Sequence, residues 1–273
     1  MSSSINFGYP WYVSYGHLVP AAVALSIGIV GHTRKWPKLP MILIGIVLLW
    51  SVAAFVVARF ALNANGRSPL PTQGFLASGE GRVLDMGAGT GRSSIMVLEA
   101  RPKATLVALD LFGESFERHF GSTESGQERL LSNLKAAGVE RRATIQAGDM
   151  RKLPFDAASF DAVVSAYAID HLNRDGVTAS LSEAARVLKP RGEFLLIVIT
   201  KDFWLKFAFG PVLLHSGTRG AAWWSGRLHQ AGFQVVEQGT RPATLYFLAR
   251  KQGMTSSFTM GRRIMRGAAS GSK

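Results

Sequence analysis

The stretch that decides the fold is Val83-Leu84-Asp85-Met86-Gly87-Ala88-Gly89-Thr90-Gly91. Its apolar start predicts a buried strand, and a helical pattern over 92–99 follows the last glycine. Glycines let the backbone approach a ligand closely, and the amino end of the following helix offers amide donors. The stretch therefore predicts a nucleotide-like ligand held at a strand–turn–helix junction.

The spacing of the glycines narrows the ligand class. A dinucleotide fingerprint has its third glycine three residues after the second. Here Gly87, Gly89 and Gly91 are spaced by two, and Arg92 stands where that third glycine would fall. No Lys-Ser or Lys-Thr pair follows, as a phosphate loop would require. The spacing therefore disfavours both a dinucleotide site and a phosphate loop.

The residues downstream predict an α/β domain of the Rossmann-like class. Short apolar runs alternate with helical stretches, which is typical of a parallel sheet with right-handed crossovers. The last two runs are separated only by 239–243, too short for a crossover helix, so they are expected to pair as a hairpin. The expected strands are 82–86, 105–109, 143–146, 162–165, 193–199, 234–238 and 244–249, with helices at 92–99, 127–137 and 178–188. We therefore expect a seven-stranded, mostly parallel sheet with a terminal β-hairpin.

The D-x-G-x-G-x-G pattern resembles the class I S-adenosylmethionine-dependent methyltransferases, over about residues 82–250. The stretch 183–192, Glu-Ala-Ala-Arg-Val-Leu-Lys-Pro-Arg-Gly, is similar to the ubiquinone-biosynthesis type of small-molecule methyltransferase, with Arg191 where a glycine is usual. The resemblance implies S-adenosyl-L-methionine as the cofactor. It implies cofactor contacts from Asp85, Gly87, Ala88, Gly89, Gly91, Asp110, Leu111, Gly148, Asp149, Met150 and Ala166.

Three of these residues have a more definite implied role. Asp110 closes the second expected strand, where the resemblance implies that a carboxylate accepts both ribose hydroxyls. Asp149 is implied to meet the adenine amino group, and Met150 to pack on the ring. Taken singly, Asp85 can simply cap the turn and Asp149 can be an acid of a surface turn.

The methyl-transfer step leaves more than one interpretation open. The methyl group of the cofactor is already activated, so alignment in a water-poor pocket is the main requirement. A general base is needed only if the nucleophile must lose a proton. His171 can accept a proton near neutral pH, and Asp170 or Tyr167 can orient it or the substrate. The alternative is that His171 only packs against its neighbours, and His119 is expected to be a solvated helix residue.

The amino-terminal part predicts a membrane anchor. Residues 41–58 carry no charge, and Ser51 is their only polar side chain. At ~1.5 Å per residue this run reaches about 27 Å, close to the hydrocarbon thickness of a bilayer. A shorter apolar run at 18–31 follows a group of aromatic residues, which suits a membrane interface. We expect one or two transmembrane helices, at about 11–31 and 41–60.

These observations divide the chain into four parts. We expect a membrane anchor at 1–62, a linker at 63–81, a methyltransferase domain at 82–252 and a basic, flexible tail at 253–273. The cofactor is made in the cytoplasm, so the catalytic domain of this integral membrane protein is expected on the cytoplasmic face. The basic loop that holds Arg34, Lys35 and Lys38 conflicts with that orientation under the positive-inside rule. Either the first apolar segment does not cross, or this loop lies outside.

Composition bears on the substrate. A net charge of +13 points to anionic partners, but residues 1–66 contain no acid and none follows Glu237, so part of the excess lies in the anchor and tail. The absence of cysteine excludes disulfides and covalent chemistry through a cysteine, and no metal site is predicted. The apolar stretch 203–215 is expected to close a substrate pocket or to touch the bilayer, with core packing as the alternative.

These features predict a membrane-anchored methyltransferase. Its substrate is expected to be a lipophilic small molecule or lipid: a quinone precursor, an isoprenoid or a phospholipid head group. The alternatives are methylation of nucleic acid or protein, with nucleic acid disfavoured because no RNA-binding module precedes the domain, and a non-catalytic S-adenosylmethionine-binding membrane protein.

Overall fold

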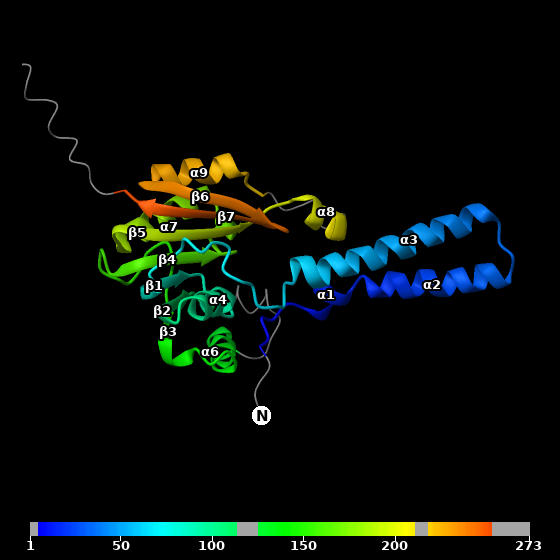
Figure 1. Ribbon diagram of the computed structural model, residues 1–273, viewed down its shortest axis with the longest axis horizontal. Helices are drawn as coiled ribbons and strands as arrows, with labels where there is room; N and C mark the ends of the chain where they lie inside the picture. Colours follow the sequence, from blue (N-terminus) through cyan, green and yellow to red (C-terminus); the bar gives the residue numbers. More distant parts are fainter. Residues whose placement is uncertain (1–4, 114–124, 211–217, 253–273) are drawn as a thin grey trace, which may run out of the picture.

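A computed structural model describes residues 5–113, 125–210 and 218–252. Its centre is a seven-stranded sheet in the order β3-β2-β1-β4-β5-β7-β6 (Figure 1). The first five strands run parallel, while β7 is antiparallel to both β5 and β6. The strands are β1 (Glu80–Met86), β2 (Lys103–Asp110), β3 (Ala143–Ala147), β4 (Phe160–Ala166), β5 (Leu188–Ile199), β6 (Phe233–Arg241) and β7 (Thr244–Lys251). The predicted mixed sheet with a terminal hairpin is confirmed.

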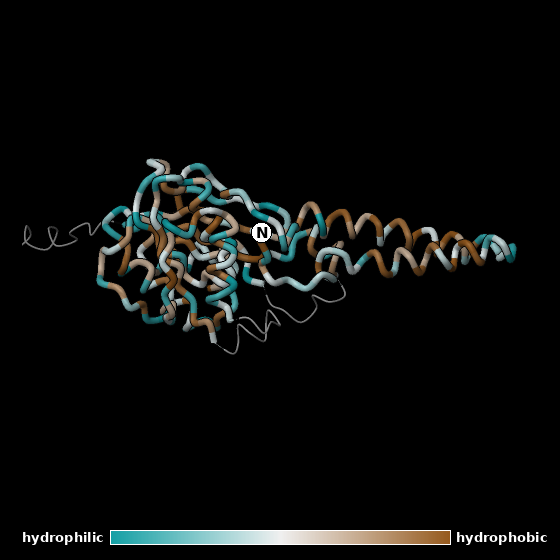
Figure 2. The backbone as a smooth tube through the Cα atoms, turned by 90° about the horizontal axis from the view of Figure 1, so that it is seen from below, coloured by the Kyte–Doolittle hydropathy of each residue, from teal (hydrophilic) through white to brown (hydrophobic). Residues whose placement is uncertain are grey.

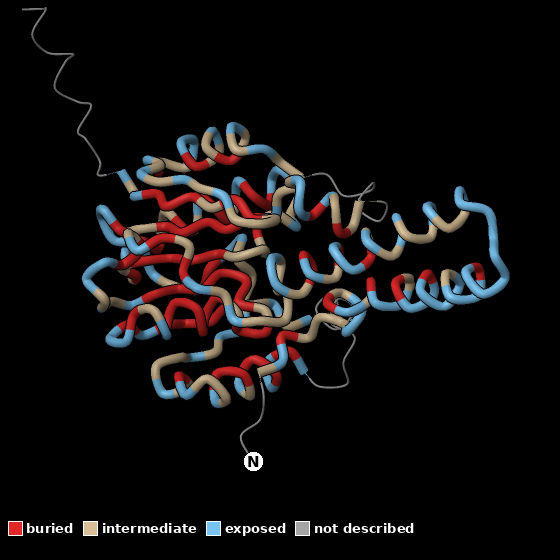
Figure 3. Tube along the Cα trace, turned by 45° about the vertical axis from the view of Figure 1, so that its right-hand side comes forward, coloured by how far each residue is buried: buried red, intermediate tan, exposed pale blue. Residues whose placement is uncertain are grey.

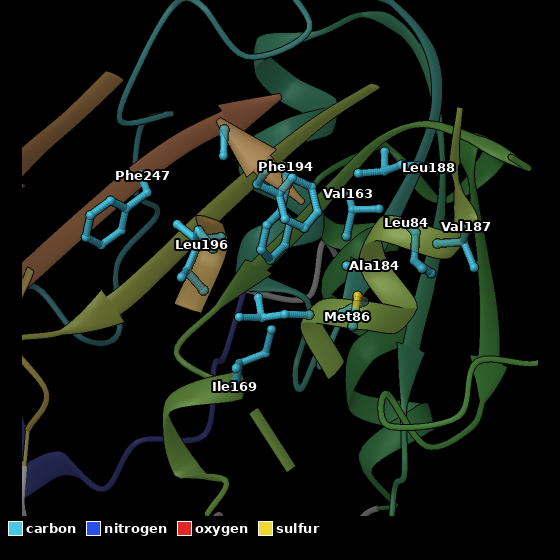
Figure 4. Packing of buried hydrophobic residues seen from close by; sticks show 14 of the residues in the cluster. Leu84, Met86, Val163, Ile169, Ala184, Val187, Leu188, Phe194, Leu196 and Phe247 are labelled. Atoms are coloured by element: carbon cyan, nitrogen blue, oxygen red, sulfur yellow. The ribbon is translucent and has the colours of Figure 1, made fainter. Parts of the chain in front are cut away.

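Helices cover both faces of this sheet. They are α4 (Arg92–Ala100), α6 (Gly126–Ala136), α7 (Arg174–Val187) and α9 (Ala221–Gln230), with short turns at η2 (Glu140–Arg142) and η3 (Ile169–His171). A further helix, α8 (Phe203–Phe209), lies at the edge of the domain (Figure 1). Because side chains alternate along a strand, Val83 packs toward α4 and α6 while Leu84 packs toward α7 and α9. Figure 4 shows part of the cluster on the α7 and α9 side of the sheet, which includes Leu84, Met86, Phe194, Leu196 and Ile169. Both faces of the sheet are thus buried, as parallel sheets require.

Two helices form a hairpin that projects from the domain. They are α2 (Leu18–Thr33) and α3 (Lys38–Val56), and α3 continues through the π-helical turn η1 (Val57–Leu62), while the short α1 (Trp11–Tyr15) precedes them. The hairpin is apolar along most of its length (Figure 2) and largely exposed (Figure 3). Within the described residues, one helix is long and apolar enough to cross a membrane, the 25-residue segment Lys38–Leu62, and α2 is shorter at 16 residues.

The segment 63–81 has the composition of a linker, but the structure packs it onto the domain. Phe75 and Leu76 are buried in the cluster around α4. The Arg101 guanidinium donates to the Phe75 carbonyl at 2.8 Å and to the Gln73 carbonyl at 2.8 Å. The Leu76 amide donates to the Glu193 carboxylate at 2.7 Å. This segment therefore belongs to the folded body of the domain.

Strand β5 begins earlier than the sequence predicts. It starts at Leu188 rather than at Glu193, directly after α7, and its register against β4 shifts between Phe160 and Ala162. Within this extension Arg191 has a φ of +62°. Left-handed backbone costs a non-glycine residue roughly 1–2 kcal/mol. This explains why a glycine suits the position better than Arg191 does.

Candidate cofactor and acceptor site

The glycine turn after β1 is shaped by left-handed backbone and close packing. Gly87, Gly89 and Gly91 have φ values of +79°, +54° and +91°. A Cβ on Gly87 would lie 2.3 Å from the Cβ of Ala168, and one on Gly91 would lie 2.4 Å from Cδ1 of Leu130. At both positions a side chain would collide with the neighbouring segment. The turn therefore presents bare backbone at the carboxyl end of β1.

Strand β2 holds the turn in place and supplies an acid beside it. The amides of Gly87 and Ala88 donate to the Leu109 carbonyl at 2.8 and 3.0 Å. The next residue, Asp110, accepts the Gly89 amide on Oδ2 at 2.9 Å and the Phe112 amide on Oδ1 at 3.3 Å. Each carboxylate oxygen keeps acceptor capacity, so Asp110 can also accept from hydroxyl groups of a ligand. Leu111 is exposed next to it.

The segment after β3 brings two more predicted residues to the same edge. Gly148 donates to the Asp110 carbonyl at 3.0 Å, which ties this turn to β2. The methyl group of Met150 would lie 2.9 Å from a Cβ on Gly87, so Met150 flanks the glycine turn. Asp149 is held by Arg151, with Nη2–Oδ2 at 2.7 Å, and this hydrogen-bonded ion pair lowers the pKa of Asp149. Arg151 therefore orients the acid expected to meet adenine.

Asp85 is turned inward, away from this edge. Its side chain is completely buried, and Oδ2 accepts the hydroxyls of Ser93 at 2.7 Å and Ser94 at 2.6 Å. Oδ1 has no hydrogen-bond partner in the described structure. Burial raises the pKa of Asp85 to about 6, and the hydrogen bonds from Ser94 and Ser93 oppose that shift. The geometry gives Asp85 the task of fastening β1 to the first turn of α4.

The segment after β4 separates the three residues expected to take part in catalysis. Tyr167 has a φ of +53°, and its hydroxyl lies 2.7 Å from Oγ1 of Thr244 on β7. Asp170 points inward, where Oδ2 accepts the Ile199 amide at 3.1 Å and Oδ1 is buried with no partner in the described structure. Burial raises the pKa of Asp170. His171 is exposed, so Asp170 is the more enclosed of the two expected proton acceptors.

The amino-terminal segment also reaches this site, which the sequence did not predict. Phe7 is buried near α4 and α6, and its carbonyl accepts the Thr90 hydroxyl at 3.1 Å. The Asn133 side chain accepts the Asn6 amide at 2.9 Å and donates to the Asn6 and Thr90 carbonyls at 2.9 and 2.8 Å. Residues 5–10 thus form a strap beside the glycine turn. No local pattern marks them, because the residues that bind the strap to the domain, Thr90 and Asn133, lie far along the chain.

Tyr9 lies on this strap next to the expected acceptor loop. It packs against the same cluster as Tyr167 and Phe112. The Tyr9 backbone is paired with Asn65, whose Nδ2 donates to the Tyr9 carbonyl at 3.0 Å. Burial raises the pKa of Tyr9; the positive charge of Arg92 opposes this shift, and Tyr167 and Asp170 add to it. The Tyr9 phenol is therefore held neutral at the edge of the site.

Residues 83–192 match a family model described as a methyltransferase domain. The chain carries an S-adenosylmethionine-dependent methyltransferase domain. A ubiquinone/menaquinone biosynthesis C-methyltransferase of Rhizobium leguminosarum bv. trifolii is 34% identical over 117 residues, which are 42% of this chain and 40% of the relative. A demethylmenaquinone methyltransferase of Deinococcus radiodurans is 31% identical over 122 residues, 45% of this chain and 44% of that relative. The chain thus covers less than half of each curated relative.

Among solved structures, the fold is similar to that of an O-methyltransferase family 2 protein of Planctomyces limnophilus, solved in complex with apigenin. That likeness has a TM-score of 0.51 at 16% identity and covers 85% of this chain and 61% of the other. At this identity the comparison concerns the fold alone.

The residues at this edge fit S-adenosylmethionine. The glycine turn ends β1 directly beside Asp110, and the two oxygens of Asp110 can accept ribose hydroxyls. Asp149 and Met150 come from the neighbouring turn, and Ala166 ends β4 beside them. Of the predicted cofactor residues, Asp85 and Ala88 have side chains buried in the core. In the described ranges, no three His, Asp or Glu side chains gather closely enough to hold a metal ion. His119 and the tail 253–273 lie outside the described residues.

Proposed function

We propose that this protein is a membrane-anchored methyltransferase that acts on a lipophilic small molecule or lipid. The observation that carries the proposal is the position of the hairpin. It projects from the side of the domain where the parallel strands end, which is also the edge that holds the glycine turn (Figure 1). An acceptor dissolved in the bilayer is then concentrated on the side where the cofactor residues lie.

The curated relatives support a quinone precursor as the first acceptor to test. One relative is a ubiquinone/menaquinone biosynthesis C-methyltransferase, a name that specifies transfer to carbon, and the other is a demethylmenaquinone methyltransferase. Isoprenoids and phospholipid head groups remain acceptors of the same lipophilic class. The apolar hairpin favours any of these over a freely soluble metabolite.

The side chains of the site divide the work of methyl transfer. When bound, S-adenosylmethionine supplies a methyl group on a positively charged sulfur. Asp110 holds the ribose, Asp149 receives the adenine amino group, and Met150 packs beside the ring. Asp170 accepts a proton from an acceptor that must lose one, because its Oδ1 is buried without a partner in the described structure and burial raises the pKa of this carboxyl. Tyr167, fixed by Thr244, orients the acceptor.

We further propose that the domain lies on the cytoplasmic face, where the cofactor is made. Asn6 bonds to Asn133, so the strap before α2 and the domain after α3 lie on the same side of the hairpin. This arrangement puts Arg34 and Lys35 at the opposite end, against the positive-inside rule. Labelling of a cysteine at position 35 in intact cells tests the orientation. Protection at 35 combined with reactivity of a domain position would contradict it.

The test of function is transfer of a labelled methyl group by the full chain in lipid vesicles. Incorporation into a total lipid and quinone extract, lost in Asp110→Ala, is the expected result. The net charge of +13 favours a polyanion as the second candidate, so RNA and protein fractions are assayed in parallel. Transfer to those fractions alone would replace the lipophilic acceptor. Cofactor binding without transfer to any fraction would indicate a non-catalytic role.

A further inference from the structure

Helix α8 follows β5 and exposes large aromatic side chains, which are unusual on the water-facing side of a helix. Leu205 and Ala208 are buried, while Phe203 and Trp204 are 67% and 44% exposed on the other face. The Phe203 ring stacks on Phe207 at 5.8 Å between centroids. A surface helix of a soluble domain presents polar side chains outward. This helix presents an aromatic cluster.

The inner face of α8 is fastened to the base of the hairpin. Nε2 of His17 donates to the Ala208 carbonyl at 2.8 Å, and Nε1 of Trp50 donates to the Phe207 carbonyl at 3.3 Å. The His17 ring also meets the Phe209 ring at 5.2 Å. The aromatic cluster is therefore continuous with the apolar surface of the hairpin, and its position relative to the hairpin is fixed.

Other exposed aromatic side chains lie at the same base. Trp11 and Tyr12 on α1 and Phe60 on η1 are exposed; α1 packs against η1, and η1 packs against α8. We name these three residues with Phe203 and Trp204 the aromatic collar. Tryptophan and tyrosine concentrate at membrane–water interfaces, because an apolar ring and a polar group suit both sides of that boundary.

Charged side chains within the collar also suit a lipid head-group layer. Arg59 lies over the rings of Tyr15 and Phe60 at 5.9 and 5.4 Å, and Lys206 is exposed on α8. The nearby acid Asp202 is already satisfied by the amides of Leu205 and Ala243, at 2.9 and 2.8 Å. Arg59 and Lys206 outnumber Asp202 here, so the surface beside the collar carries a net positive charge.

We propose that the aromatic collar seats the domain in the phospholipid head-group layer, with the edge that holds the glycine turn facing the bilayer. This inference rests on the proposed membrane anchoring and adds a second, shallower contact to it. The acceptor then passes from lipid to the site without crossing bulk water. The collar also fixes the height of the domain, which a two-helix hairpin alone leaves free.

The chain contains no cysteine, so one introduced cysteine takes a fluorescent label at a single place. Three full-length variants are compared in phosphatidylcholine–phosphatidylglycerol vesicles. Phe203→Cys labels the collar, Leu49→Cys labels the exposed face of α3, and Lys103→Cys labels the amino end of β2, opposite the site. The probe is an environment-sensitive dye, and its depth is measured with lipids that carry a quencher near the head group or deep in the acyl chains.

We expect blue-shifted emission and shallow quenching at 203, deep quenching at 49 and aqueous emission at 103. If 203 resembles 103 while 49 is quenched by lipid, the collar does not enter the head groups, although the anchor stands. If all three positions remain aqueous, both the collar and the membrane anchor are wrong. All three positions are exposed, so the substitutions should not disturb the fold. Circular dichroism and S-adenosylmethionine binding check that each labelled variant is folded.

Discussion

At the scale of single residues, two carboxylates near the glycine turn have opposite tasks. Asp85 is enclosed and bonded to Ser93 and Ser94, whereas Asp110 lies at the open edge with Gly89. Their chemistry is the same, and their surroundings differ. We therefore expect Asp85 to affect the stability of the fold and Asp110 to affect ligand binding. Substitutions can separate these two effects.

The first prediction concerns Asp110. Asp110→Ala removes the acceptor for the ribose hydroxyls and the partner of the Gly89 amide. A charge-assisted hydrogen bond contributes about 1.5–3 kcal/mol, so the dissociation constant for S-adenosylmethionine should rise roughly 10- to 100-fold. Isothermal titration calorimetry measures this change. Asp156→Ala, an exposed acid, serves as the control, and unchanged affinity in Asp110→Ala would refute the site.

The second prediction concerns Asp85 and pH. Its pKa is raised from 3.8 to about 6, so the folded state holds this proton more tightly than the unfolded chain does. Stability linked to this group is complete below about pH 4 and declines as pH rises toward 6, by about 3 kcal/mol in total. Asp85→Asn removes the ionisation. We expect its free energy of unfolding in urea to exceed that of the wild type at about pH 7.5.

The difference in free energy of unfolding between Asp85→Asn and the wild type should shrink as pH falls from about 6 to about 4. This pH dependence distinguishes Asp85 from other titrating groups. S-adenosylmethionine affinity should change little, because the side chain does not reach the edge of the site. A variant that differs from the wild type by the same free energy at every pH would show that the pKa of Asp85 is not shifted between the folded and unfolded states.

The third prediction compares Asp170 with His171. Asp170 is half-buried, with Oδ2 accepting the Ile199 amide, and His171 is exposed. Asp170→Asn should lower kcat by about 10²–10⁴-fold if proton removal accompanies transfer, while His171→Ala should leave most of the activity. The acid limb of the pH–rate profile, where protonation of Asp170 removes the base, should persist in His171→Ala. The opposite ranking of the two variants would make His171 the base.

At the scale of elements, the strap 5–10 and the glycine turn are held by one side chain of α6. Asn133 makes three hydrogen bonds, to Asn6 twice and to the Thr90 carbonyl once. It is 2% exposed, so its partners would be left unsatisfied without it. The strap, α6 and the cofactor turn therefore form one coupled unit.

The fourth prediction follows from that coupling. Asn133→Ala should lower the free energy of unfolding by about 2–3 kcal/mol, at roughly 1 kcal/mol per hydrogen bond. It should also weaken S-adenosylmethionine binding, because Thr90 belongs to the turn. Denaturant unfolding and calorimetry measure the two effects. Lys135→Ala, on the exposed face of the same helix, should change neither, and normal cofactor affinity in Asn133→Ala would separate the strap from the site.

At the scale of the whole molecule, the domain and the hairpin differ in how much apolar surface they expose. The domain buries both faces of its sheet, whereas the hairpin leaves large apolar side chains such as Ile46 and Leu49 exposed. Contiguous exposed apolar surface of this extent is typical of a site that meets a membrane or a partner. The exposed apolar side chains thus distinguish the hairpin from the domain.

The fifth prediction tests that division. Ile46→Lys with Leu49→Lys should shift the protein from the membrane fraction to the soluble fraction, since a lysine at mid-membrane costs about 2.5–3.5 kcal/mol. Carbonate extraction followed by immunoblotting measures the partition. Leu131→Lys places the same charge on an exposed apolar position of α6 and should leave the partition unchanged. Retention of the double variant in membranes would contradict insertion of α3.

Local pattern determined much of this protein. The alternation of strands and helices and the uncharged run 41–58 each depend on neighbours in sequence, so local pattern predicts the sheet and an apolar helix. The five residues at 239–243 likewise allowed only a hairpin. These inferences needed nothing beyond the backbone periodicity of one or two elements, whereas the cofactor class was implied by the resemblance of the glycine turn to that of the class I methyltransferases.

Only the tertiary structure decided which predicted residues share a site and which do not. It placed β7 between β5 and β6, turned Asp85 inward, exposed His171 and brought the strap 5–10 to the glycine turn. It also packed 63–81 onto the domain despite a composition typical of a linker. These features depend on contacts between residues distant in the chain, such as Asn6 with Asn133, and no local pattern records them. The aspartate of the opening stretch, Asp85, shows the distinction: its position followed from sequence, and its burial followed from the packing of α4 over β1.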